Sequence, residues 1–106
     1  MEKLQFEFPG GTPVNTKAAP VLVGVVSSGN LEVLIESLAL NGTCRIEVTT
    51  AARGFDNVWT AVLRDFFARS QLGDVRISIN DVGATPAVVS LRLDQAVEEF
   101  KNQVRP

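Results

Sequence analysis

The sequence of 106 residues contains no histidine and no tyrosine, and it has a single cysteine, Cys44. Without histidine, the chain lacks the usual general base for a serine or cysteine nucleophile and the commonest metal ligand. A lone cysteine excludes an internal disulfide, fits a reducing cytoplasm and argues against a zinc site. A free-standing enzyme would have to work with carboxylates or lysines alone. We therefore expect neither a catalytic residue nor a metal ligand.

Clusters of one charge sign and long apolar runs are also missing. The formal net charge is −2, and the ten Lys and Arg are interspersed with the twelve Asp and Glu. This pattern disfavours nucleic-acid binding through a basic patch. No apolar run approaches the ~20 residues that span a bilayer. The first residues alternate polar and apolar side chains, unlike the apolar core of a secretion signal. We expect a cytoplasmic protein with no nucleic-acid or membrane partner.

Five stretches of the chain have the residue pattern of β-strands. In four of them apolar side chains alternate with polar ones, which predicts one buried and one exposed face. The positions expected to face inward are Leu4, Phe6 and Phe8, then Leu31, Val33 and Ile35, then Ile46 and Val48, then Val75, Ile77 and Ile79. The remaining stretch, Val21–Val26, is nearly all apolar and predicts a strand covered on both faces. Cys44 falls on an inward face, so we expect a small buried hydrophobe.

Two segments have the 3.6-residue periodicity of amphipathic helices. Asp56 is the expected cap of the first helix, and Thr85 is the expected cap of the second, with Pro86 at its first position. The second helix is expected to run to about Val104, because Pro106 then stops it. The apolar stripes that should pack on the core are Trp59, Val62, Leu63, Phe66 and Phe67 in the first helix and Val89, Leu93, Ala96, Val97 and Phe100 in the second.

The resulting order of elements is β–β–β–β–α–β–α. Gly29-Asn30 and Asn41-Gly42 are turn signals between successive strands, so consecutive hairpins should make the sheet mostly antiparallel. The strand–helix–strand unit at residues 45–80 requires a right-handed crossover if its strands are parallel. Both helices would then cover one face of a sheet of about five strands. The prediction is an α+β two-layer sandwich in which residues 1–106 form a single domain, as the length and the 45% apolar content favour.

The turn in LVGVVSSGNLEVL contains two serines, Ser27 and Ser28, followed by Gly29. Short hydroxyl side chains satisfy local backbone groups, so a purely structural role is the ordinary one for a turn serine. Ser28, however, precedes a glycine at the tip of a predicted hairpin, where another enzyme could approach its hydroxyl. Because the chain has no base of its own, a functional serine here would be a point of attachment rather than a nucleophile.

Two stretches, LVGVVSSGNLEVLIES and RISINDVGATPAVVSLRLDQAVEE, resemble the acyl carrier (delta) subunits of malonate decarboxylase and, more distantly, the gamma subunits of citrate lyase. The resemblance extends from EKLQFEFP to the final helix. It is carried by the Ser-Gly turn and by Asp81, Gly83 and Ala84 before the last helix. Asn30 stands where the commoner motif has Asp. The chain lacks the Asp-Ser-Leu helix start of the four-helix acyl carrier proteins, so that fold is not expected.

The resemblance implies a covalent prosthetic group, 2′-(5″-phosphoribosyl)-3′-dephospho-CoA, linked to Ser28 through a phosphodiester, with Gly29 shaping the turn. On the thiol of this group the subunit would carry acetyl and malonyl while malonate is converted to acetate and CO2. It would deliver substrate and catalyse nothing itself. The implied partners are the acyltransferase and decarboxylase subunits, the transferase that attaches the prosthetic group and the acyltransferase that loads malonyl. Docking is expected around Ser28, where Glu32 and Asn30 are the polar side chains best placed to meet partners.

Two other interpretations remain open from the residues alone. One is an α+β interaction or regulatory module whose turn serine is purely structural. The other is a small enzyme that uses Asp81 and neighbouring carboxylates, although Asp81 is placed to end a strand and to organise the turn into the last helix. The intact mass of natively produced protein separates the carrier from the module. Turnover without partner subunits would indicate the enzyme.

Overall fold

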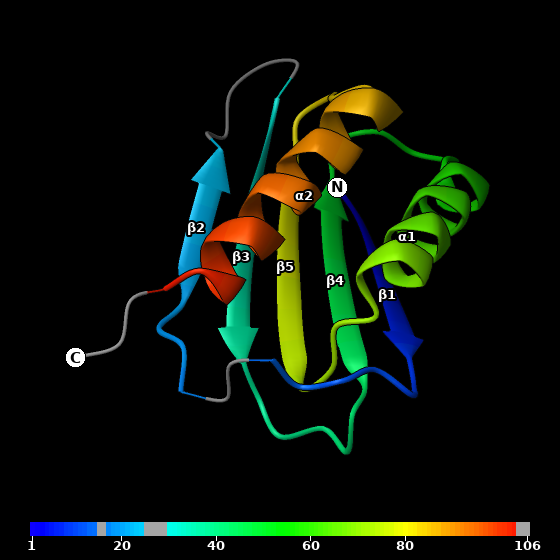
Figure 1. Cartoon of the computed structure of the whole chain (residues 1–106). Coiled ribbons are helices and arrows are strands. Elements are labelled where there is room, and N and C mark those ends of the chain that lie inside the picture. Colours follow the sequence, from blue (N-terminus) through cyan, green and yellow to red (C-terminus); the bar gives the residue numbers. More distant parts are fainter. Residues whose placement is uncertain (15–16, 25–29, 104–106) are drawn as a thin grey trace.

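Five strands form one sheet, and two helices pack on one of its faces (Figure 1). The computed structural model describes residues 1–14, 17–24 and 30–103. The predicted α+β class and the predicted order of elements are confirmed. The elements are β1 (Glu2–Phe8), β2 (Val21–Gly24), β3 (Leu31–Ser37), β4 (Cys44–Thr50), α1 (Asp56–Ser70), β5 (Val75–Asp81) and α2 (Pro86–Lys101).

The strands lie in the order β1-β4-β5-β3-β2, and every neighbouring pair is antiparallel except β4 and β5. The parallel pair is the predicted strand–helix–strand unit, with α1 as the crossover. The expected hairpin between β3 and β4 is wrong, because β5 lies between these strands. A turn does occur at Asn41 and Gly42, which have φ values of 55° and 82°. It carries the chain past β5, where Asp74 Oδ1 accepts hydrogen bonds from the backbone N–H groups of Leu40 (3.1 Å) and Gly42 (2.7 Å).

β2 is an edge strand with only one covered face, which corrects the prediction for Val21–Val26. Val21 is buried, whereas Leu22 points to the opposite side and is 58% exposed. Both helices lie on one face of the sheet (Figure 1), and the buried Val21 belongs to the core on that face, so β2 has one covered and one uncovered face. Val25 and Val26 lie outside the described residues.

The core lies between the sheet and the helices. The predicted inward residues of β3, β4 and β5 are at most 1% exposed, and the strand register places Ile35 and Ile46 on either side of Ile77. The predicted burial of Cys44 is confirmed, since it is 0% exposed and burial raises the pKa of its thiol to about 12. The thiol is therefore protonated and uncharged at neutral pH. In the other edge strand, β1, the inward residues are only partly buried: Leu4, Phe6 and Phe8.

Helix α1 packs its apolar stripe on the core, as predicted. Its buried side chains are Trp59, Leu63 and Phe66. The ring of Phe67 stacks on that of Phe8 in β1, with 5.2 Å between the ring centroids. The predicted cap is wrong by one residue: Asp56 is the first helical residue, and Phe55 takes the capping position without a side-chain hydrogen bond. Asp56 is still favourable there, because its carboxylate lies near the positive end of the helix dipole.

Helix α2 begins as predicted and ends earlier than predicted. Thr85 is the N-cap, and its Oγ1 accepts a hydrogen bond from the backbone N–H three residues later (3.3 Å). Pro86 occupies the first helical turn, where its missing N–H has no cost. The helix ends at Lys101 with Asn102 as its C-cap. The expected extension to about Val104, a residue outside the described ranges, is therefore too long.

We expect Trp59→Ala to destabilise the fold by about 3–5 kcal/mol, because it removes a large aromatic side chain from the core. Trp59 is only 6% exposed. Val58→Ala, at a neighbouring residue that is 41% exposed, is the matched control and should cost less than about 1 kcal/mol. Urea unfolding followed by circular dichroism measures both variants. Equal stability of the two would show that the helix stripe is not part of the core.

Candidate functional site

Three strand ends and the N-termini of both helices meet at one edge of the sheet. This edge is formed by the ends of the strands and is not one of the edge strands β1 and β2. Leu31, the first residue of β3, pairs with Asp81, the last residue of β5, and Asp81 pairs in turn with Thr50, the last residue of β4. The helices start a few residues after β4 and β5, so their N-termini lie at the same edge (Figure 1). Gly24 of β2 pairs with Glu32. The chain on both sides of residues 25–29 is thereby brought to this edge.

The predicted attachment residue, Ser28, and its neighbour Gly29 lie outside the described residues. The residues that bound this segment, Gly24 and Asn30, are described. The carbonyl oxygen of Asn30 accepts a hydrogen bond from the backbone N–H of Val82 (2.9 Å). The Ser-Gly-Asn motif and the Asp-x-Gly-Ala motif are therefore joined through these two residues, a contact that neither motif reveals by itself.

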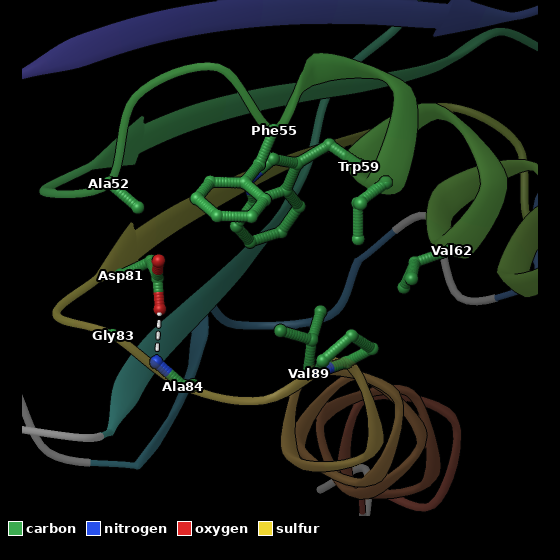
Figure 2. A pocket seen from close by; sticks show the side chains of 10 residues that line it. Ala52, Phe55, Trp59, Val62, Asp81, Gly83, Ala84 and Val89 are labelled. Carbon is green, nitrogen blue, oxygen red and sulfur yellow. Dashed lines mark hydrogen bonds between the residues drawn. The ribbon is translucent and has the colours of Figure 1, made fainter.

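Asp81 organises the turn between β5 and α2, as its position in the sequence predicted. It is 3% exposed, and both carboxylate oxygens accept hydrogen bonds. Oδ2 accepts from Thr50 Oγ1 (2.7 Å), and Oδ1 accepts from the backbone N–H of Ala84 (2.8 Å; Figure 2). Gly83 has a φ of 92°, a left-handed conformation that favours glycine. A carboxylate held in this way is a structural group, which argues against an enzyme that uses Asp81 as its acid or base.

An apolar pocket of about 360 Å³ lies between the first turns of α1 and α2 (Figure 2). Phe55 and Trp59 line it from the α1 side, Val89 lines it from α2, and Asp81 lines it from the end of β5. Asp81 is the only ionisable side chain among the ten residues that line the pocket. Because this carboxylate is already hydrogen-bonded, the lining residues provide no free base, nucleophile or cation.

Arg92 lies beside the two residues that bound the segment 25–29, and no sequence pattern pointed to it. Its Nη2 donates a hydrogen bond to Asn30 Oδ1 (3.4 Å). A Cβ atom placed on Gly24 would lie 3.4 Å from the Arg92 Cδ. Asn30 Oδ1 also accepts from the backbone N–H of Leu31 (2.9 Å), as asparagine side chains do in turns. The contact with Arg92 joins residues 62 positions apart, which no local spacing rule detects.

Glu32, a predicted docking residue, lies on the face of the sheet that carries no helix. The alternation of β3 buries Leu31 and Val33 on the helical side and turns Glu32 away from it. Glu32 Oε1 accepts a hydrogen bond from Asn80 Nδ2 of β5 (3.3 Å). Through its pairing with Gly24, this partly exposed carboxylate also stays close to the segment 25–29.

Among the described residues, no group of three His, Cys, Asp or Glu side chains is arranged to hold a metal ion. Within the same part of the chain, neither helix is long and apolar enough to cross a membrane.

Comparisons with known proteins identify similar sequences along most of the chain. Residues 18–100 match the family described as Malonate decarboxylase delta subunit. The chain is 61% identical over 98 residues to the malonate decarboxylase acyl carrier protein of Xanthomonas campestris pv. campestris (strain B100), covering 92% of this chain and 93% of that relative. It is 61% identical over 99 residues to the protein of the same name from Burkholderia cepacia, covering 93% of this chain and 90% of that relative.

A solved structure has a similar fold. It is a chain of the crystal structure described as a Pseudomonas malonate decarboxylase hetero-tetramer in complex with malonate. The two chains are 41% identical and superpose with a TM-score of 0.84, covering 94% of this chain and 99% of that chain. The family match over residues 18–100 includes both motifs.

Asp81→Ala should destabilise the protein by about 1–3 kcal/mol, because it leaves the Thr50 hydroxyl and the Ala84 backbone N–H without their acceptor. Asp65→Ala is the control, since the Asp65 side chain is 75% exposed and pairs only at the surface. It should change the free energy of unfolding by less than about 1 kcal/mol. Urea denaturation gives both values. If the two variants are equally stable, the buried carboxylate does not hold this edge of the sheet together.

Proposed function

The chain belongs to the malonate decarboxylase delta-subunit family, the acyl carrier proteins of that decarboxylase, and we propose that Ser28 is the residue to which its prosthetic group is attached. An acyl carrier subunit is a carrier rather than a catalytic subunit. The observation that supports Ser28 most directly is the position of Gly24 and Asn30, which bound residues 25–29 and lie at the edge where the two family motifs meet. Within that segment, Ser28 is the serine directly before a glycine, as the family motif requires.

The prosthetic group that we propose is 2′-(5″-phosphoribosyl)-3′-dephospho-CoA, joined to the hydroxyl oxygen of Ser28 through a phosphodiester. When bound, this group supplies a thiol that carries acyl groups as thioesters. The described residues fit such a group in two respects. The thiol of Cys44 is buried and its pKa is raised to about 12, so the reactive thiol has to come from outside the chain. The Arg92 guanidinium, which donates a hydrogen bond to Asn30 Oδ1, places a positive charge beside one end of the segment, and this charge suits an anionic linkage.

The contribution of the protein is to tether the acyl group and present it to partner active sites. A tether replaces bimolecular encounter with an effective concentration that is set by the length of the arm. The partners in this proposal are the acyltransferase and decarboxylase subunits, the transferase that attaches the group and the acyltransferase that loads malonyl. Acetyl and malonyl would alternate on the carrier while malonate is converted to acetate and CO2. The similar Pseudomonas chain comes from a malonate decarboxylase described as a hetero-tetramer, which supports an assembly of this kind.

Residues 1–106 act in this proposal as one carrier domain that works in the cytoplasm, where a lone cysteine stays reduced. The alternative is an interaction or regulatory module of the same fold whose turn serine is structural. The two differ in covalent chemistry, because only the carrier gains the mass of a prosthetic group.

Ser28→Ala should abolish attachment of the prosthetic group and leave the fold unchanged, because it removes only the hydroxyl oxygen that would form the phosphodiester. Ser27→Ala, at the adjacent hydroxyl, is the matched control and should be modified like the parent. The measurement is intact-mass spectrometry of each protein produced together with the attaching transferase, with melting curves to verify folding. A cofactor mass on Ser28→Ala, or its loss in Ser27→Ala alone, would place the attachment elsewhere.

Glu32→Lys should slow acyl transfer to the partner subunits about 3- to 10-fold, the equivalent of roughly 0.7–1.4 kcal/mol of docking free energy. Its free energy of unfolding should stay within about 1 kcal/mol of the parent, because only the hydrogen bond from Asn80 is lost. Glu99→Lys is the control. It makes the same change of charge at an exposed residue near the C-terminal end of α2. Transfer rates are compared on fully modified proteins. An equal effect of both variants would indicate a general charge effect and no docking role for Glu32.

A further inference from the structure

Arg92 contacts Asn30 and lies close to Gly24, the two described residues that bound the segment containing Ser28. Its Nη2 donates to Asn30 Oδ1 (3.4 Å), and its Cδ would lie 3.4 Å from a Cβ atom on Gly24. Ser28 is two residues from Asn30, so chain connectivity keeps their Cα atoms within about 7 Å of each other, whatever path the segment follows. The described residue nearest to Ser28 on the C-terminal side, Asn30, therefore lies within hydrogen-bonding reach of the Arg92 guanidinium.

The positive charge of Arg92 is not neutralised by a carboxylate among the described residues. Three other arginines form ion pairs with Asp or Glu at distances between 2.6 and 3.2 Å, namely Arg45, Arg69 and Arg76. Arg92 instead donates to two amide oxygens, Asn30 Oδ1 and Gln95 Oε1 (3.2 Å). Because amide oxygens are neutral, the guanidinium keeps its capacity to bind an anion.

One buried donor of this guanidinium has no acceptor among the described residues. The Nε–H of Arg92 is shielded from solvent and has no hydrogen-bond partner in the described part of the chain. A buried donor without an acceptor is unfavourable and calls for an explanation in the function of the site. The Nε and an adjacent Nη of arginine form a pair of donors that match two oxygens of one phosphate. The contact from Nη2 to Asn30 is long at 3.4 Å, so an anion could replace it at little cost.

We propose that Arg92 binds phosphate oxygens of the prosthetic group attached at Ser28 and thereby holds the first part of the arm beside β2 and α2. This inference rests on the proposed attachment at Ser28. Its ligand chemistry is a phosphodiester or pyrophosphate. Arg92 acts here as a positioning residue that takes no part in acyl transfer. By restricting the base of the arm, it reduces the conformational freedom that each docking event must otherwise remove.

The test compares modified and unmodified forms of the parent, Arg92→Gln and Arg64→Gln. Arg64 is an exposed arginine of α1 and controls for the loss of one positive charge. Melting temperatures are measured at low and high salt after intact mass has established the extent of modification. Attachment should raise the melting temperature of the parent and of Arg64→Gln by a few degrees at low salt and by less at high salt. It should leave that of Arg92→Gln unchanged.

Phosphorus NMR on the same modified samples reports directly on the phosphate groups. Their ³¹P signals should move in Arg92→Gln relative to the parent and stay in place in Arg64→Gln. A purely structural role for Arg92 would lower the stability of both forms equally and would not move these signals.

A titration with inorganic pyrophosphate tests the same contact without any attachment. In the unmodified parent, the NMR signal of the Arg92 Nε–H should shift on addition of pyrophosphate and should not shift with sodium chloride at equal ionic strength. The Arg64 Nε–H is the internal control. If no mass is gained at Ser28, the proposed function fails, and this titration still decides whether Arg92 binds phosphate. The titration also decides whether Arg92 binds phosphate if Arg92→Gln cannot be modified, because it needs no attached group.

Three results would overturn the inference. The first is an Arg92→Gln protein whose melting temperature rises on attachment as much as that of the parent, with unchanged ³¹P signals. The second is slower transfer to partner subunits with unchanged ³¹P signals, which would make Arg92 a docking residue for protein. The third is an Arg92 Nε–H signal that pyrophosphate does not shift.

Discussion

The hydrogen-bonded carboxylate of Asp81 is the interaction on which the edge that holds both family motifs depends. A carboxylate that is 3% exposed is unfavourable unless its oxygens find donors, and here the Thr50 hydroxyl and the Ala84 backbone N–H each satisfy one oxygen. The first bond ties β5 to the end of β4, and the second fixes the turn into α2. The next residue, Val82, holds the backbone of Asn30. One side chain therefore joins the end of the sheet to the start of a helix, and the residue next to it binds Asn30, which bounds the segment 25–29.

The rest of the fold suits a protein that carries a group and leaves its chemistry to others. Both helices cover one face of the sheet, and the pocket between their first turns is lined by apolar side chains and the already engaged Asp81. When an attached group provides the reactive atom, the protein needs a rigid support and few reactive side chains of its own. The absence of histidine from the sequence agrees with this division of roles. In the proposed function, the chain contributes the attachment site of the group and the surface that partners meet.

Sequence patterns predicted the features that depend on neighbouring residues. The alternation in β3, β4 and β5 and the Thr85-Pro86 start of α2 are correct, because one-sided burial and helix capping are local effects. The exposure of Leu22 and the insertion of β5 between β3 and β4 depend on which strands become neighbours, and residue periodicity does not contain that information. Arg92 was missed for the same reason, since its contact with Asn30 is long-range. Ser28 was identified through the family motif and stays a prediction, because it lies outside the described residues.

If the chain carries a thioester as proposed, the burial of Cys44 prevents loss of the acyl group to this thiol. An acyl group migrates between thiols when a thiolate attacks its carbonyl carbon, which requires both access and ionisation. Cys44 on β4 is 0% exposed and the pKa of its thiol is about 12, so it has neither near neutral pH. With the proposed arm in place, the acyl group cannot migrate to Cys44, and mild oxidation cannot join the arm to Cys44 as a disulfide. The buried core that stabilises the fold thus also keeps the Cys44 thiol from competing for the acyl group of the proposed arm.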